Sequence, residues 1–311
     1  MKKFFKWSFY FLVIVLFLYT VRKIDFNILN HLKSLSLWKV AFLILLQCLS
    51  IVIIALQWQS IIQKFHTKVN LLKIVELNII GTFTESITPA VKSGGEGVKL
   101  LLLKQYFSME YNEGLSVIIA QKVVSAGVFF LYFLISIICL DFKFTLSYQS
   151  CFLFLGILLI LGITLYYLFP KKYKAKTTQF LKKVKENLDL IRQDNKLFYQ
   201  LLVNNLIVWL GYPLKLYIVS SAFDVQLSFF QLSGIIFITY GVSMLPTTPG
   251  SIGTYEGTMA MLLTLNKVPL DIALGVSMIT RFFTFWLVVL GSGIYLLIKQ
   301  FLNKEPKEIT P

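Results

Sequence analysis

An apolar part of the chain is broken at Pro246-Thr-Thr-Pro-Gly-Ser-Ile-Gly-Thr-Tyr-Glu-Gly257, between the short apolar segments 229–245 and 258–265. The two prolines and three glycines of this stretch do not continue an α-helix, so the flanking segments form separate elements. At membrane depth such a break is tolerated only inside protein or against a wet cavity, because free backbone groups need partners. The break is therefore the first candidate for a functional site.

A similar stretch occurs 160 residues earlier, in the segment 84–97. Both copies contain Thr-Pro, then six residues, then Glu-Gly, a combination that a shared apolar composition does not explain. A long apolar span follows each copy, with a cation 26 residues after the first glutamate and 25 after the second. We interpret this pattern as an internal repeat. The paired positions are Gly81/Gly241, Thr88/Thr248, Pro89/Pro249, Glu96/Glu256, Gly97/Gly257, Leu102/Leu262 and Leu103/Leu263, and the cations are Lys122 and Arg281.

The composition excludes a soluble fold, since 57% of the residues are hydrophobic, 14% are charged and the mean hydropathy is +0.74. Thirty Lys and Arg residues face 15 Asp and Glu, a net charge of +15. In a membrane protein this excess lines cytoplasmic loops and faces anionic head groups, so nucleic acid is not the expected partner. Cys48, Cys139 and Cys151 are small apolar residues, and the isolated His31 and His66 lack metal-ligand spacing, so no cofactor is expected.

Six segments are long and apolar enough to cross a bilayer, whereas 71–83 and 98–107, around the first break, are shorter. Segment 171–196 carries nine cations, with apolar residues at helical spacing. This pattern predicts a basic amphipathic helix on the cytoplasmic, anionic surface, with a solvated linker as the alternative. The six predicted spans are 4–21, 38–62, 114–140, 151–169, 198–222 and 271–298.

Each broken element either crosses the membrane or returns to its own side as a re-entrant hairpin. Hairpins place both termini and the basic segment in the cytoplasm and the poorly charged loops near 145, 225 and 268 outside, as the positive-inside rule favours. We therefore predict an all-α polytopic protein of the cell membrane, one domain over 1–311, whose hairpins form an inverted repeat as in transporters. Repeat one covers about 38–140 and repeat two about 198–298, and they are joined by 151–169 and 171–196.

The residues around both breaks resemble the flippase-like family, also called the lysylphosphatidylglycerol synthase transmembrane region, which includes the membrane part of the multiple peptide resistance factor. The resemblance spans about residues 4–300 and implies a domain that moves lipids between leaflets. In bifunctional members a soluble domain transfers the aminoacyl group, and we expect no such domain in a sequence ending at Pro311. Lys122 is a departure, since these proteins commonly carry arginine there. The candidate substrate-binding residues are Pro89, Gly94, Gly95, Glu96, Lys99, Lys122, Pro249, Gly250, Gly253, Glu256 and Arg281.

Each candidate also has a structural interpretation. Glu96 follows Ser93 by three residues, as in a capping box, but the counterpart of that serine before Glu256 is Gly253. Capping alone therefore does not explain both glutamates, and pairing with Lys122 and Arg281 is expected, either at a functional site or as a static bridge. The glycines either bring backbone N–H groups to a phosphate or serve turn geometry and close packing.

Two classes of function remain open at this stage. The first is a carrier that moves an anionic phospholipid or a polyprenyl-linked lipid between leaflets. The second is a membrane enzyme, or a non-catalytic accessory subunit of an envelope lipid or glycan pathway, beside a lipid-modifying partner. We expect no catalysis, because no acid–base pair, activated nucleophile or metal cluster is recognisable.

Overall fold

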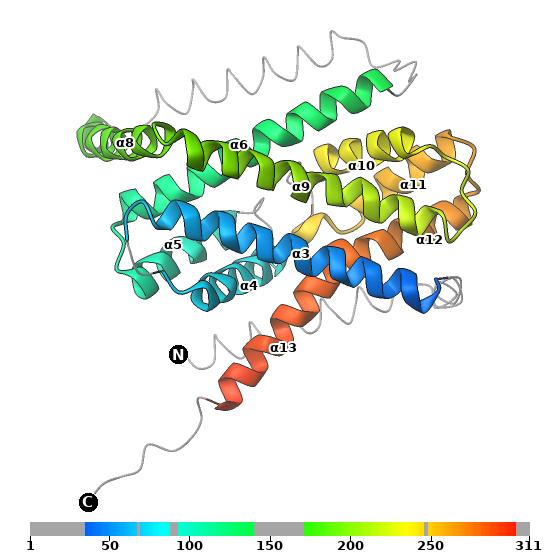
Figure 1. Ribbon diagram of the computed structural model, residues 1–311, viewed down its shortest axis with the longest axis horizontal. Helices are drawn as coiled ribbons and strands as arrows, with labels where there is room; N and C mark the ends of the chain where they lie inside the picture. The colour runs from blue at the N-terminus through cyan, green and yellow to red at the C-terminus, as the bar shows by residue number, and fades with distance from the viewer. Residues whose placement is uncertain (1–34, 67–68, 88–92, 140–170, 246–247, 303–311) are drawn as a thin grey trace, which may run out of the picture.

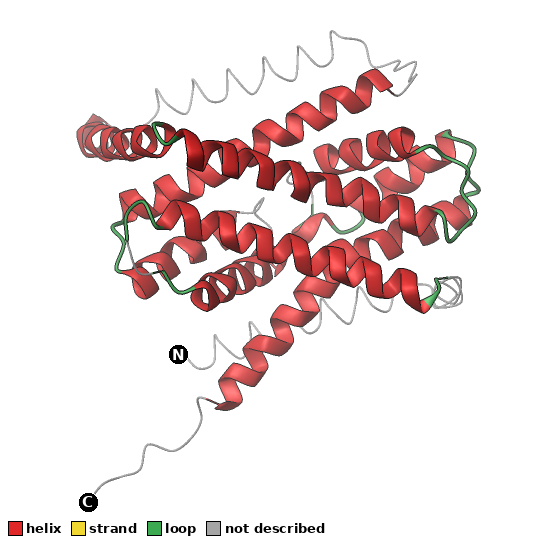
Figure 2. Ribbon diagram, in the orientation of Figure 1, coloured by secondary structure: helices red, strands yellow, loops and turns green. Residues whose placement is uncertain are grey.

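The computed structural model describes residues 35–66, 69–87, 93–139, 171–245 and 248–302. Within these ranges every regular element is a helix and no strand is present (Figure 2). The all-α class predicted from composition is therefore correct. Of the features predicted from the sequence, Pro89 and the spans 4–21 and 151–169 lie outside the described residues.

Four helical segments are long and apolar enough to span a membrane: Leu37–Ile62, Tyr111–Ser136, Asn195–Ser220 and Leu270–Gln300. They coincide with four of the six predicted spans. Side chains fix two of their starts, since Ser36 Oγ accepts the Lys39 N–H at 3.4 Å and Asp194 Oδ1 accepts the Leu197 N–H at 2.9 Å. The elements concerned are α3 (Leu37–Ile62), α6 (Tyr111–Cys139), α9 (Asn195–Ser220), and the continuous run α12 (Leu270–Arg281), η2 (Phe282–Trp286) and α13 (Leu287–Leu302).

Two pairs of shorter helices flank the breaks. The first pair is α4 (Leu71–Ile87) and α5 (Ser93–Phe107), and the second is α10 (Phe229–Ser243) and α11 (Thr254–Leu265), with the single turn η1 (Pro249–Ser251) between them. The predicted start of the helix after the first break, at 98, was wrong by five residues. Gly95 lies inside α5, where a Cβ would stand only 2.6 Å from the Gly81 carbonyl oxygen. Close packing of α4 on α5 therefore requires this glycine.

The two helix pairs approach the middle of the bundle from opposite ends (Figure 1). The α3–α4 and α5–α6 connections lie at the end that carries α8, and the α9–α10 and α11–α12 connections lie at the other end. The breaks meet in between, because η1 packs against α4 and a Cβ on Gly250 would lie 3.3 Å from the Ser86 carbonyl oxygen. This is the arrangement that opposed hairpins require, while the repeat boundaries stay a prediction.

The basic segment forms α8 (Lys171–Arg192), which ends four residues earlier than predicted because Asp194 caps α9 and Lys196 belongs to α9. Its apolar stripe does not face lipid throughout. Val184 and Ile191 are buried, and Ser116 of α6 donates a hydrogen bond to the Val184 carbonyl at 3.4 Å. The helix is thereby docked on α6, and Lys182, Lys183 and Lys185 are exposed.

The core has two apolar clusters. One gathers α9, α10, α11 and α12 around Phe237 and Met259, and the other gathers α3, α4, α5 and α6 around Trp58 and Leu103. Exposed leucine, isoleucine and phenylalanine side chains cover the outer surfaces of α3, α6 and α13. A bundle with apolar side chains both inside and outside is typical of a protein embedded in lipid.

Candidate charged centres at the two breaks

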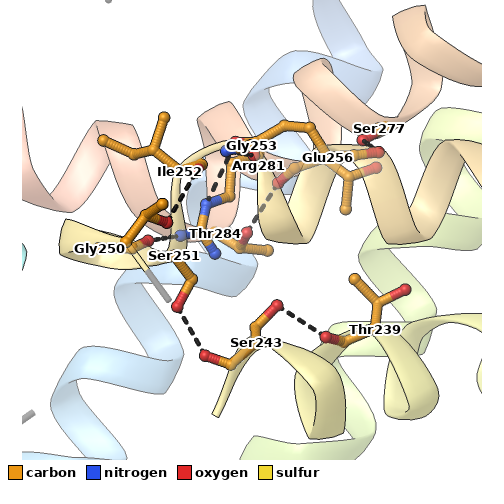
Figure 3. A network of polar contacts seen from close by, with 12 residues as sticks. Thr239, Ser243, Gly250, Ser251, Ile252, Gly253, Glu256, Ser277, Arg281 and Thr284 are labelled. Atoms are coloured by element: carbon orange, nitrogen blue, oxygen red, sulfur yellow. Dashed lines mark hydrogen bonds and ion pairs between the residues drawn. The ribbon is translucent and has the colours of Figure 1, made fainter. Parts of the chain in front are cut away.

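Arg281, at the end of α12, is enclosed by the second break. Its guanidinium donates a hydrogen bond to the Gly250 carbonyl, and its Nε lies 3.7 Å from Glu256 Oε1 (Figure 3). The rings of Tyr255 and Phe285 lie 4.4 Å and 4.2 Å from its Cζ. Only 6% of the side chain is exposed, and its Nε, although it faces Glu256, has no hydrogen-bond partner among the described residues.

The Glu256 carboxylate has two separate tasks. Its Oε2 accepts the Gly253 N–H at 2.7 Å, which is the carboxylate half of a capping box at the start of α11. Its Oε1 faces Arg281. From the sequence, the glycine at position 253 removed the serine half of a capping box. The carboxylate half is still present, because the Gly253 backbone N–H donates to Glu256.

The backbone of the second break folds back on itself. Gly250 and Gly253 have φ values of 59° and 82°, in the left-handed region that glycine adopts without strain. Ser251 Oγ donates to the Ser243 carbonyl at 2.6 Å, which ties the break to the end of α10 (Figure 3). Thr248 Oγ1 donates to the Ile252 carbonyl at 2.8 Å. Free backbone groups of the break are thus satisfied internally, as membrane depth requires.

The first break carries a different charged centre. Glu96 Oε1 accepts from two lysines, Lys122 of α6 at 2.9 Å and Lys99 of α5 at 3.2 Å. The other carboxylate oxygen, Oε2, is buried and has no hydrogen-bond partner among the described residues. Of the two lysines, Lys122 is exposed over 44% of its side chain, whereas Lys99 is buried.

Lys99 reaches this centre along α4. A Cβ on Gly81 would lie 2.4 Å from Lys99 Cε and 2.7 Å from Lys99 Cγ, so the aliphatic stem crosses α4 where glycine leaves room. The ammonium of Lys99 lies 5.2 Å from the ring centroid of Trp58 on α3. The cation is therefore desolvated by an aromatic face on one side and held by Glu96 on the other.

The two cations, Lys122 and Arg281, lie at matching positions along their helices. Lys122 is eleven residues beyond Tyr111, the start of α6, and Arg281 is eleven beyond Leu270, the start of α12. Eleven residues of α-helix rise about 16 Å, which is half of a hydrocarbon core about 30 Å thick. Because α6 and α12 start at opposite ends of the bundle, the cations reach the middle from opposite directions (Figure 1).

The structure thus joins Glu96 with Lys99 and Lys122, and Glu256 with Arg281, Gly250 and Gly253. Gly94 lies in the first turn of α5, and Pro249 opens η1. Gly95 allows α4 and α5 to pack closely, and the Gly250 carbonyl accepts a hydrogen bond from Arg281, so both glycines have structural roles. The described residues contain no group of three His, Cys, Asp or Glu that could hold a metal ion.

One buried cation was missed from the sequence, and one carboxylate, Glu76, was expected only as polar lining. Lys215 of α9 is fully buried and donates to Gln47 Oε1 of α3 at 2.6 Å. A single cation inside an apolar span indicates a buried polar contact, and the sequence shows such a cation at position 215. Glu76 of α4 accepts from Tyr106 at 2.9 Å and from Lys299 of α13, and so links the two halves of the bundle at the α8 end.

One pocket of about 410 Å³ lies away from both breaks, at the α9–α10 connection. Polar side chains form much of its wall, and none of the candidate site residues contributes to it. The lining residues are Tyr217, Ser220, Ser221, Asp224, Val225, Gln226, Leu227, Ser228 and Leu232.

Apolar spanning helices with charged centres at two broken helix pairs define an integral membrane protein of the broken-helix type. The chain belongs to the family described as the lysylphosphatidylglycerol synthase transmembrane region, whose model matches residues 7–292. It is similar to the UPF0104 membrane protein PH1989 of Pyrococcus horikoshii, 24% identical over 82% of this chain and 85% of the relative. MJ1595 of Methanocaldococcus jannaschii, another UPF0104 membrane protein, is 24% identical over 84% of this chain and 85% of the relative.

Proposed function

We propose that this protein is a lipid carrier, which moves an anionic phospholipid or a polyprenyl-linked lipid between the leaflets of the cell membrane. The observation that carries the proposal is the exposure of Lys122 at mid-membrane depth. A charge at that depth disfavours insertion by a few kcal/mol, so it is retained where it serves a site.

A purely static bridge does not explain this exposure. A bridge that only holds two helices together is best buried, as Arg281 and Glu256 are. Lys122 instead leaves almost half of its side chain uncovered while its ammonium contacts Glu96. An ammonium has three N–H donors, and an incoming phosphate oxygen can take those that Glu96 leaves free.

The opposed arrangement of the helix pairs supports transport rather than binding alone. Broken helices that meet near the midplane from opposite sides give a site that either leaflet can reach in turn. The family description names a phospholipid, lysylphosphatidylglycerol, which supports a lipid as the cargo. The acyl chains remain in the bilayer while the head group passes the charged centre.

The same proposal fixes the orientation. The α8 end of the bundle, with the lysines of α8 and the Lys299 end of α13, faces the cytoplasm and the anionic inner leaflet. Both termini then lie in the cytoplasm. Since the apolar stripe of α8 is docked on α6, its attraction to lipid comes from its lysines rather than from insertion.

Reconstitution tests the proposal directly. Proteoliposomes carry a fluorescent phosphatidylglycerol in both leaflets, and a membrane-impermeant reductant bleaches the outer leaflet. We expect the protein to carry inner-leaflet lipid outward, so that bleaching exceeds the half seen in protein-free vesicles. Bleaching that stops at half, with folded protein present in the vesicles, contradicts a carrier and favours the enzyme or accessory role.

A further inference from the structure

The two charged centres differ in net charge. Glu96 is one negative charge shared by the two ammonium groups of Lys99 and Lys122, so the first centre has a net charge of +1. At the second centre Glu256 and Arg281 balance. The position 160 residues after Lys99 is Met259, a fully buried core residue without charge.

A second carboxylate lies near this centre. Glu85 of α4 lies against α5, since a Cβ on Gly95 would stand 2.9 Å from Glu85 Cβ. It has an interaction of its own, and the excess of one positive charge belongs to the three residues that the Glu96 ion pairs join. The exposed member of these three, Lys122, is the one that an anion can reach.

The two centres also differ in access. The guanidinium of Arg281 is held by a backbone carbonyl, a carboxylate and two aromatic rings, and would have to leave all of them to bind a head group. Lys122 has to leave none, because 44% of its side chain is exposed and Glu96 is its one ion-pair partner among the described residues.

We propose that the two copies have unequal roles: the first centre binds the phosphate of a lipid that carries one net negative charge, and the second centre locks the other break. Lys122 contacts the phosphate, and Glu96 and Lys99 position Lys122. Arg281 joins α12 to η1 and holds the second break closed. This assignment rests on the proposed function only in taking the ligand to be a lipid.

The charge count sets the ligand class. A phosphate with one negative charge neutralises the first centre, whereas a zwitterionic head group brings its own cation next to Lys122. A phosphodiester, as in phosphatidylglycerol, carries this single charge, and a prenyl phosphate, which is a monoester, carries between one and two negative charges at neutral pH. Phosphatidylcholine is the matched neutral lipid.

Trp58 gives a binding signal that does not depend on transport, because its ring lies 5.2 Å from the Lys99 ammonium. The protein is placed in phosphatidylcholine nanodiscs, and phosphatidylglycerol or a prenyl phosphate is added at rising mole fraction. We expect the tryptophan fluorescence to change and saturate with both anionic lipids. The Trp58→Phe variant loses this change.

Variants then separate the two centres. Lys122→Met shifts half-saturation to about tenfold more anionic lipid or beyond, since a contact to a charged group is lost. Lys122→Arg restores binding, and Lys267→Met, an exposed lysine at the far end of the bundle, behaves as wild type. Arg281→Lys lowers the melting temperature, and its half-saturation shifts less than that of Lys122→Met.

Three results would overturn the assignment. The first is Lys122→Met binding like wild type, and the second is Arg281→Lys losing more affinity than Lys122→Met. The third is saturation by inorganic phosphate at the same concentration as the lipids, which would make the site one for free phosphate. If wild type fails to move lipid in vesicles while these binding results hold, the carrier function is wrong and the binding site stands.

Discussion

Glu256 and Arg281 are joined through one carboxylate oxygen, at 3.7 Å, while the other oxygen caps α11 through the Gly253 N–H at 2.7 Å. The pair links α11 and α12, two helices that follow the break and are adjacent along the chain. A residue that both caps and pairs is difficult to replace, because each task needs a different property. Hydrogen bonding serves the cap and charge serves the arginine.

Two substitutions at Glu256 separate these tasks. Glu256→Gln keeps an acceptor for the Gly253 N–H but leaves Arg281 without a counter-charge, and we expect a loss of about 2 kcal/mol in unfolding free energy. Glu256→Ala also loses the cap, about 1 kcal/mol more. Thermal unfolding in detergent checks this, with the exposed Glu186→Gln on α8 as a control that stays near wild type. Equal melting temperatures for Gln and Ala variants would show that the cap contributes nothing.

Two glycines at the second break should respond to alanine with opposite signs. Gly250 has a φ of 59°, and a Cβ there would lie 3.0 Å from Phe285 Cζ, so Gly250→Ala destabilises by about 2 kcal/mol. Gly257 lies within α11, and a Cβ there meets nothing within 4 Å. Gly257→Ala gains up to about 1 kcal/mol of helix propensity. Melting temperatures that fall equally in both variants would contradict the distinction.

Acid should weaken the junction between α8 and α9. The hydrogen bond from Lys64, together with that from the Leu197 N–H, lowers the pKa of Asp194 below its ordinary value of 3.8. Because the folded pKa is the lower one, the stabilisation is fully present above 3.8 and is lost as the pH falls through the folded value. The Asp194→Asn variant keeps a cap but has no charge. We therefore expect its melting temperature to approach that of wild type as the pH falls below 3.8. A melting-temperature difference that widens on acidification would contradict the lowered pKa of Asp194.

The orientation is open to labelling in intact cells. In a version without Cys48, Cys139 and Cys151, we expect an impermeant maleimide to label Lys267→Cys and to leave Gln193→Cys unlabelled until the membrane is permeabilised. The reason is that the cation-rich α8 end faces the cytoplasm. The reverse pattern would contradict this orientation.

Four of the six predicted spans and the pairing of glutamates with cations could be predicted, because apolar length and the repeated Thr-Pro and Glu-Gly spacing are visible in the linear sequence. The start of α5 could not, since Gly95 contributes to a helix contact with Gly81 that only the folded chain shows. For the same reason Lys99 was a candidate without a partner, and its sharing of Glu96 with Lys122 came from the fold.

The second copy of the repeat also differs from the first in the spacing and the helix geometry around its cation. Its glutamate-to-cation interval is one residue shorter, and a π-helical turn, Phe282–Trp286, follows Arg281 directly. Such a turn accommodates one extra residue.

The central claim, that the exposed cation of the first centre binds the lipid phosphate, is tested most directly by exchanging its charges. The double variant Glu96→Lys with Lys122→Glu keeps an ion pair between α5 and α6 and keeps the net charge, but it places a carboxylate at the exposed position. Because the new lysine lies beside Lys99 in the first turn of α5, we expect this variant to melt below wild type but to fold, and to move phosphatidylglycerol in proteoliposomes no faster than protein-free vesicles do. Transport at the wild-type rate would show that the pair is only a static bridge, and would contradict the account.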